Sequence, residues 1–92
     1  MNGQFENLVK SIISQQELII GPVAIEEANK VPGLNISSDG KTATITGDGK
    51  AVLEGLVKQY ASLFGRVSVE VCREAVSAVV GDQKEILPDI LR

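Results

Sequence analysis

The first third of the chain carries a helical pattern of hydrophobic and polar positions. Between residues 5 and 24, apolar side chains recur three or four residues apart, and polar side chains fill most positions between them. Gly21 and Pro22 interrupt this pattern, because proline lacks a backbone N–H and crowds the preceding helical turn. The sequence therefore predicts a helical segment over residues 3–30 that is kinked at residues 21–22 into two parts.

A strand-like alternation replaces the helical pattern in residues 34–46. Apolar and polar side chains alternate on both sides of an Asp39-Gly40 pair, which is a strong signal for a β-hairpin. One face of the predicted ribbon is apolar: Leu34, Ile36, Ala43 and Ile45. Because a two-stranded ribbon is marginal in water by itself, we expect this face to pack on helices.

Two helices and an apolar tail follow the hairpin. A broad apolar stripe predicts a helix over residues 49–64, which Gly65 ends. Ser68 is a suitable N-cap for a second helix over residues 68–80, which stops at Gly81. In the tail, residues 82–92, Pro88 argues against one continuous helix. The expected fold is a single α+β domain, predominantly helical, over residues 1–92.

The residue types present exclude most of the usual catalytic chemistry. The chain contains no histidine and no tryptophan, so it lacks Ser–His and Cys–His pairs, histidine metal ligands and imidazole proton transfer. The single cysteine, Cys72, would be a nucleophile if a base, a cation or a helix N-terminus acidified its thiol. Its apolar helical face favours a buried core thiol instead. We therefore expect no enzymatic activity and no cofactor.

Charge and hydropathy narrow the classes of partner. Nine Lys and Arg residues stand against twelve Asp and Glu, the net charge is −3, and the basic residues are spread singly along the chain. Nucleic-acid binders usually gather basic charge on one face and often add stacking aromatics, so no nucleic-acid partner is expected. The longest apolar runs are far shorter than a membrane span, and the beginning of the chain does not resemble a signal peptide. One cysteine fits a reducing compartment, and the expected location is cytoplasmic.

Two local clusters have a functional interpretation beside a structural one. The Gly47-Asp48-Gly49-Lys50 turn lies between a strand and a helix, where backbone amides of Gly47 and Gly49 and the Lys50 ammonium could hold an anionic ligand. The turn lacks the length and the Ser or Thr of a P-loop, which favours a tight connection in which Asp48 or Thr46 caps the helix. Glu70 and Glu74 could hold a hard cation, but Arg73 is a ready ion-pair partner, and a solvated face is favoured.

The apolar stripes themselves predict a protein–protein interaction. A chain of 92 residues has difficulty hiding two broad helical stripes behind a thin hairpin, and unhidden stripes mark protein contacts. The function expected is a small cytoplasmic interaction or regulatory module that acts as a homodimer or on another protein. The tail either folds back on the core or docks on another chain. The expected contact residues are Phe5, Leu8, Ile12, Ile19, Ile86, Leu87, Ile90 and Leu91. The alternative function is binding of a small anionic ligand by Gly47, Gly49 and Lys50.

Overall fold

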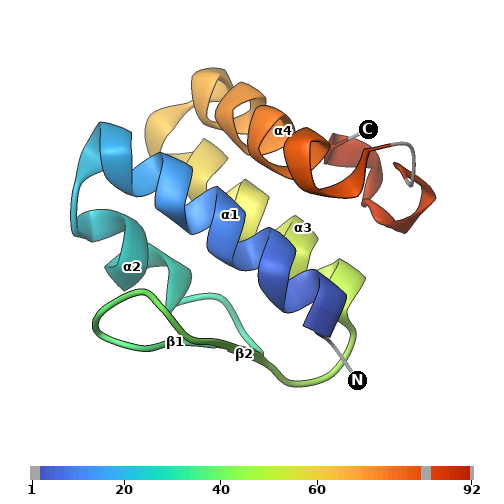
Figure 1. Ribbon diagram of the computed structural model, residues 1–92. Helices are drawn as coiled ribbons and strands as arrows, with labels where there is room; N and C mark the ends of the chain where they lie inside the picture. Colours follow the sequence, from blue (N-terminus) through green and yellow to red (C-terminus); the bar gives the residue numbers. More distant parts are fainter. Residues whose placement is uncertain (1–2, 82–83, 92) are drawn as a thin grey trace.

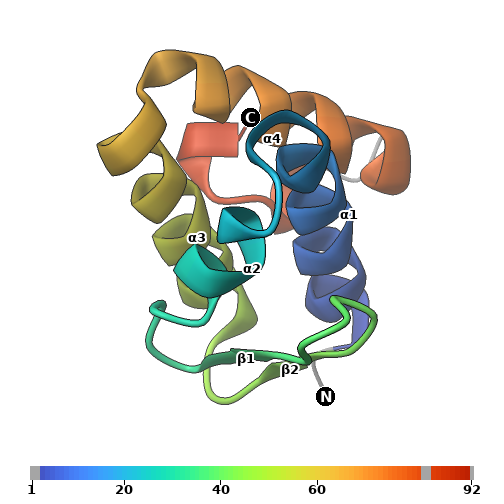
Figure 2. The same ribbon diagram turned by 90° about the vertical axis from the view of Figure 1, so that its left-hand side faces the viewer.

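The computed structural model describes residues 3–81 and 84–91 and confirms a predominantly helical α+β fold with one antiparallel hairpin in that part of the chain. In chain order, the elements are α1 (Gly3–Ile20), α2 (Val23–Ala28), β1 (Leu34–Ile36), β2 (Ala43–Ile45), α3 (Gly49–Phe64), α4 (Arg66–Val80) and the 3₁₀ helices η1 (Lys84–Ile86) and η2 (Asp89–Leu91). Helices α1, α3 and α4 pack together, while α2 and the hairpin cover the side away from α4 (Figure 1 and Figure 2).

The break between α1 and α2 is a reversal rather than a kink. Gly21 adopts a left-handed backbone with φ of +74°, and its N–H donates to the Glu17 carbonyl at 2.9 Å, which closes α1. Pro22 then precedes α2, which folds back beneath α1 (Figure 1). A glycine in this conformation turns the chain more sharply than a proline kink inside a continuous helix.

The hairpin has the predicted apolar face. The strands pair with Leu34 opposite Ile45 and Ile36 opposite Ala43, and all four side chains are buried against the helices. In the connecting loop, Asp39 Oδ1 accepts from the Ser37 hydroxyl at 2.6 Å and from the Lys41 N–H at 3.0 Å. These two hydrogen bonds, that of Ser37 first, lower the pKa of Asp39 below its usual value.

Side chains from two helical elements close the outer edges of this hairpin. Asn29, which follows α2, accepts from the Ile36 N–H at 2.7 Å and donates to the Ile36 carbonyl at 3.2 Å. On the other strand, the Glu6 carboxylate of α1 accepts from the Ile45 N–H at 3.2 Å. Unpaired strand edges attract other strands, so these side chains occupy backbone groups that a foreign strand would otherwise pair with.

One glycine serves as the end of α3 and the beginning of α4. Gly65 has φ of +81°; its N–H donates to the Ala61 carbonyl at 2.9 Å, and its carbonyl accepts from the Ser68 N–H at 3.1 Å. Helix α4 therefore begins at Arg66, two residues before the predicted start at 68. Ser68 lies inside the first turn and does not cap the helix, since the N-cap position belongs to Gly65.

The C-terminal tail folds back on the domain's own core. The predicted tail covers residues 82–92, of which 82, 83 and 92 lie outside the described residues. Leu87 and Leu91 are each 1% exposed, and η2 packs against α3 and α4. Pro88 separates the two 3₁₀ turns, in agreement with the absence of one continuous helix.

The chain hides most of its apolar stripes without a partner. Its accessible surface is 5129 Å² for a mass of 9.8 kDa. A compact monomer of that mass exposes about 5,200 Å². The expectation that two helical stripes remain uncovered is therefore not met, because the tail and the hairpin supply more cover than their short lengths indicate.

Candidate functional site

The last turn of α1 lies beside the α3–α4 junction at one end of the molecule (Figure 1 and Figure 2). An apolar groove opens between these segments. Its volume is about 240 Å³. We call this feature the apolar groove, and it is lined by Gln16, Ile19, Ile20, Phe64, Val67, Ser68 and Val71. The two helix ends come together here because Gly21 and Gly65 each allow a helix to stop abruptly.

The rim of the apolar groove is unusually exposed for aliphatic and aromatic side chains. Val67 is 73% exposed, Ile19 is 61% and Phe64 is 40%. Leu18 and Leu63, the neighbours of Ile19 and Phe64 along the chain, are also exposed. We call Val67, Ile19 and Phe64, which all line the groove, the apolar end face. Exposed apolar patches that surround a concavity are typical of binding surfaces.

The floor of the apolar groove is polar. Gln16 and Ser68 are the two buried polar side chains in the part of the chain that the structure describes, at 1% and 4% exposure, and both line the groove. Gln16 Nε2 donates to the Ser68 carbonyl at 3.2 Å and to Cys72 Sγ at 3.5 Å. Gln16 therefore joins α1 to α4 beneath the groove, and the Ser68 carbonyl as acceptor fixes the orientation of its amide.

Cys72 is a core thiol, as its helical face predicts. Its side chain is fully buried, and burial raises its pKa to about 11, while the hydrogen bond from Gln16 lowers the pKa by a smaller amount. A nucleophilic cysteine needs a thiolate near neutral pH, and this environment favours the protonated form.

The buried thiol leads to a testable expectation on reactivity. At pH 8, we expect iodoacetamide to modify Cys72 at least about 100-fold more slowly in the folded chain than in 6 M guanidinium, because both burial and the raised pKa remove thiolate. Mass spectrometry of the alkylated chain measures both rates. Similar rates in the two conditions would show that Cys72 is accessible in the folded protein.

The raised pKa of Cys72 makes the stability of the domain depend on pH. The unfolded chain loses the Cys72 proton near pH 8.5, whereas the folded chain holds it until about pH 11. The raised pKa therefore stabilises the folded chain, and this stabilisation is complete below about pH 8.5 and is lost as the pH rises toward 11.

The structure places the eight sequence-predicted contact residues mainly inside the domain. Leu8, Ile12, Leu87 and Leu91 are at most 1% exposed and belong to the core. Phe5, Ile86 and Ile90 are partly buried and pack against that core. Ile19 is the one that is largely exposed, and it lines the apolar groove. The contact surface available to a partner therefore differs from the predicted one, because the helical stripes face one another.

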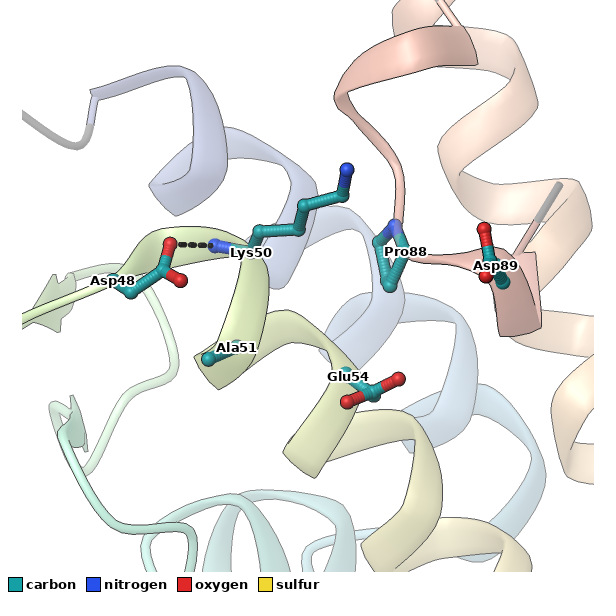
Figure 3. A pocket seen from close by; sticks show the side chains of 6 residues that line it. All are labelled: Asp48, Lys50, Ala51, Glu54, Pro88 and Asp89. Atoms are coloured by element: carbon teal, nitrogen blue, oxygen red, sulfur yellow. Dashed lines mark hydrogen bonds between the residues drawn. The ribbon is translucent and has the colours of Figure 1, made fainter.

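The turn at residues 47–50 is a capped helix start. Asp48 Oδ1 accepts from the Lys50 N–H at 3.1 Å, which confirms the predicted capping role of Asp48 (Figure 3). Gly49 is buried against the Phe5 ring, Gly47 is exposed with φ of +92°, and the Lys50 side chain extends toward the tail, where Nζ lies 3.5 Å from the Glu85 carbonyl.

The surroundings of this turn are unsuited to an anion. A polar pocket of about 280 Å³ lies beside it, lined by Asp48, Lys50, Ala51, Glu54, Pro88 and Asp89 (Figure 3). Three carboxylates share this pocket with one ammonium group, so the local charge repels an anionic ligand. The turn brings Gly47, Gly49 and Lys50 together, but Asp48 already occupies the Lys50 N–H that an anion would use.

The paired glutamates of α4 form part of a solvated face. Arg73 Nη1 lies 2.6 Å from Glu70 Oε1, as the i,i+3 spacing predicts, and both side chains are substantially exposed. Within residues 3–81 and 84–91, no group of three or more His, Cys, Asp or Glu side chains is arranged to hold a metal ion. Exposed pairs of this kind contribute little to stability.

One position in the sequence is a signal for the apolar groove. Gln16 falls at a helical core position, four residues after Ile12 and three after Ile13, where an apolar side chain is expected. A polar residue at such a position marks a buried hydrogen bond or a site. Val67, by contrast, follows the Gly65 turn and carries no distinguishing pattern before the fold is known.

Comparisons of the chain with protein-family models, curated proteins and solved structures find no match. Among the described helices, none has both the length and the apolar character that crossing a bilayer requires.

Proposed function

We propose that the chain is a non-enzymatic protein-interaction module of the cytoplasm that pairs with a second copy of itself through the apolar end face. The observation that carries this proposal is the exposure of Val67, Ile19 and Phe64 around a concavity. Removal of such side chains from water by a partner is favourable and stabilises the complex. A cytoplasmic location suits the free thiol of Cys72.

A second copy is the proposed partner because the end face contains both projections and a hollow. In a two-fold dimer the same patch of both chains forms the interface, so the apolar end face of one copy lies against that of the other. A stable interface needs about 800 Å² from each partner. That is about one sixth of the 5129 Å² that the chain exposes.

Val67→Glu is the direct test of the pairing. The side chain is 73% exposed, so the monomer tolerates the change, whereas a dimer would bury two unpaired carboxylates near its axis. We expect the dimer dissociation constant to rise about 100-fold, which corresponds to about 2.7 kcal/mol shared between two equivalent sites. Light scattering after size-exclusion chromatography, over a hundredfold range of concentration, measures the mass.

Val79→Glu is the matched control. Val79 is 48% exposed on the same helix, about 18 Å further along its axis, and does not line the apolar groove. Its substitution is expected to leave the dimer unchanged. A wild-type chain that stays at 9.8 kDa throughout the range would refute self-association, and equal effects of both variants would refute the choice of face.

A further inference from the structure

The two polar side chains on the floor of the apolar groove retain unused hydrogen-bonding capacity. Both side-chain hydrogen bonds of Gln16 are donated by Nε2. Within the described residues, neither Gln16 Oε1 nor the Ser68 hydroxyl has a hydrogen-bond partner. Neither atom is sealed from solvent, so both are open to a molecule in the groove. A molecule in the groove therefore finds two hydrogen-bond acceptors on its floor.

The apolar end face of a second copy offers these atoms no side-chain donor. The side chains of the apolar end face are those of isoleucine, phenylalanine and valine, none of which carries a donor. The single tyrosine, Tyr60, is fully buried, and its hydroxyl donates to the Ala24 carbonyl at 2.6 Å. A small molecule that carries a donor therefore fits the groove floor, whereas the proposed second copy lies on the rim.

The size and walls of the groove define this occupant. A sealed cavity of about 150 Å³ lined by aliphatic and aromatic side chains holds one benzene ring. The apolar groove, at about 240 Å³, has room for one or two fused rings between Ile19, Val71 and Phe64. No lining residue carries a charge, so a neutral ligand is favoured over an anion or a cation.

We propose that the apolar groove binds a neutral aromatic molecule of one or two rings that carries one N–H or O–H donor, the chemistry of an indole or a phenol. The ring occupies the apolar walls, and the donor reaches Gln16 Oε1 or Ser68 Oγ. Sites for small molecules generally combine apolar walls with a few such polar groups. This inference rests on the groove itself and does not require that the chain dimerises.

Indole and indene form the decisive pair of probes, because the two molecules have nearly the same shape and indene lacks the N–H. Each is titrated into the ¹⁵N-labelled chain at low micromolar concentration, and amide shifts are followed by NMR. We expect shifts at Ile19, Ile20 and Val67–Val71, and about a two- to tenfold tighter binding of indole, which is the contribution of one hydrogen bond.

Two substitutions test whether Gln16 and Ser68 on the groove floor cause the preference for indole over indene. Gln16→Met keeps the side-chain length and removes the amide, and Ser68→Ala removes the hydroxyl; both together are expected to bring the indole-to-indene ratio to about one. Ser77→Ala, an exposed serine on the same helix, is the control and is expected to keep the ratio. The affinities of the parent chain for indole and indene are compared without any substitution. A folding defect in Gln16→Met therefore leaves this comparison intact.

Three outcomes would overturn the proposal: no binding of either probe at its solubility limit, equal affinity for both, or shifts confined to residues outside the groove. Each of these differs from the failure of self-association, which is a wild-type mass of 9.8 kDa at all concentrations. A chain that stays monomeric and still binds indole more tightly than indene would support the ligand site and refute self-association.

Discussion

Replacing Ile12 with glutamate is expected to unfold the domain rather than to separate two folded copies. Ile12 is 0% exposed and lies in the core formed by α1 and the other helices. A carboxylate there has no cationic partner, and its burial costs several kcal/mol in addition to the lost apolar packing of isoleucine. We expect a loss of at least about 5 kcal/mol, which approaches the whole stability of a domain of this size.

Ile19→Glu is the matched variant for this experiment. It makes the same substitution on the same helix, two turns further along, at a side chain that is 61% exposed. We expect it to keep the circular dichroism and urea midpoint of the parent and to weaken self-association. If Ile12→Glu remained folded with native helix content, this result would contradict the burial of this face of α1.

Gly33→Ala is expected to destabilise the domain by about 3 kcal/mol. Gly33 has φ of +84°, which costs about 1–2 kcal/mol for a residue with a Cβ. The added methyl group would also lie 2.7 Å from the Thr46 carbonyl oxygen, across the hairpin pair in which the Thr46 N–H donates to the Gly33 carbonyl at 2.8 Å. Because the opposing atom belongs to the backbone, relief requires that the strands move apart.

Gly47→Ala separates these two contributions. Gly47 also has a positive φ, +92°, but an added Cβ meets nothing within 4 Å. Its substitution should therefore cost only the conformational part, about 1–2 kcal/mol. Urea unfolding of both variants measures the difference, and equal losses would show that the close approach at Gly33 is relieved without cost.

Local pattern accounts for most of the secondary structure. The alternation around Asp39-Gly40 placed Leu34, Ile36, Ala43 and Ile45 on one face, and this assignment is confirmed. The predicted start of α4 was wrong by two residues. Ser68 is a good local signal for a helix cap, but Gly65 ends α3 and also occupies the N-cap position of α4. A choice between two adequate local signals depends on how the two helices pack.

The candidate site was the least predictable part. The turn at 47–50 has the glycines and the lysine of an anion site, and Glu54 lies one helical turn after Lys50 on α3, but the carboxylate of Asp89 approaches only after the tail folds on α3. The apolar groove unites residue 16 with residues 64–71, which are far apart along the chain. The interrupted core pattern at Gln16 was the available signal.

The sequence by itself determined the helices, the hairpin and which side of each element is apolar, because these properties depend on residues a few positions apart. Only the tertiary structure decided which apolar sides meet one another and which remain on the surface. Leu8 and Leu91 have the same character as Val67 and Ile19, but the first two lie between packed elements and the last two lie beyond the ends of the packing. Burial depends on the joint positions of several elements, and no single stretch of sequence contains that information.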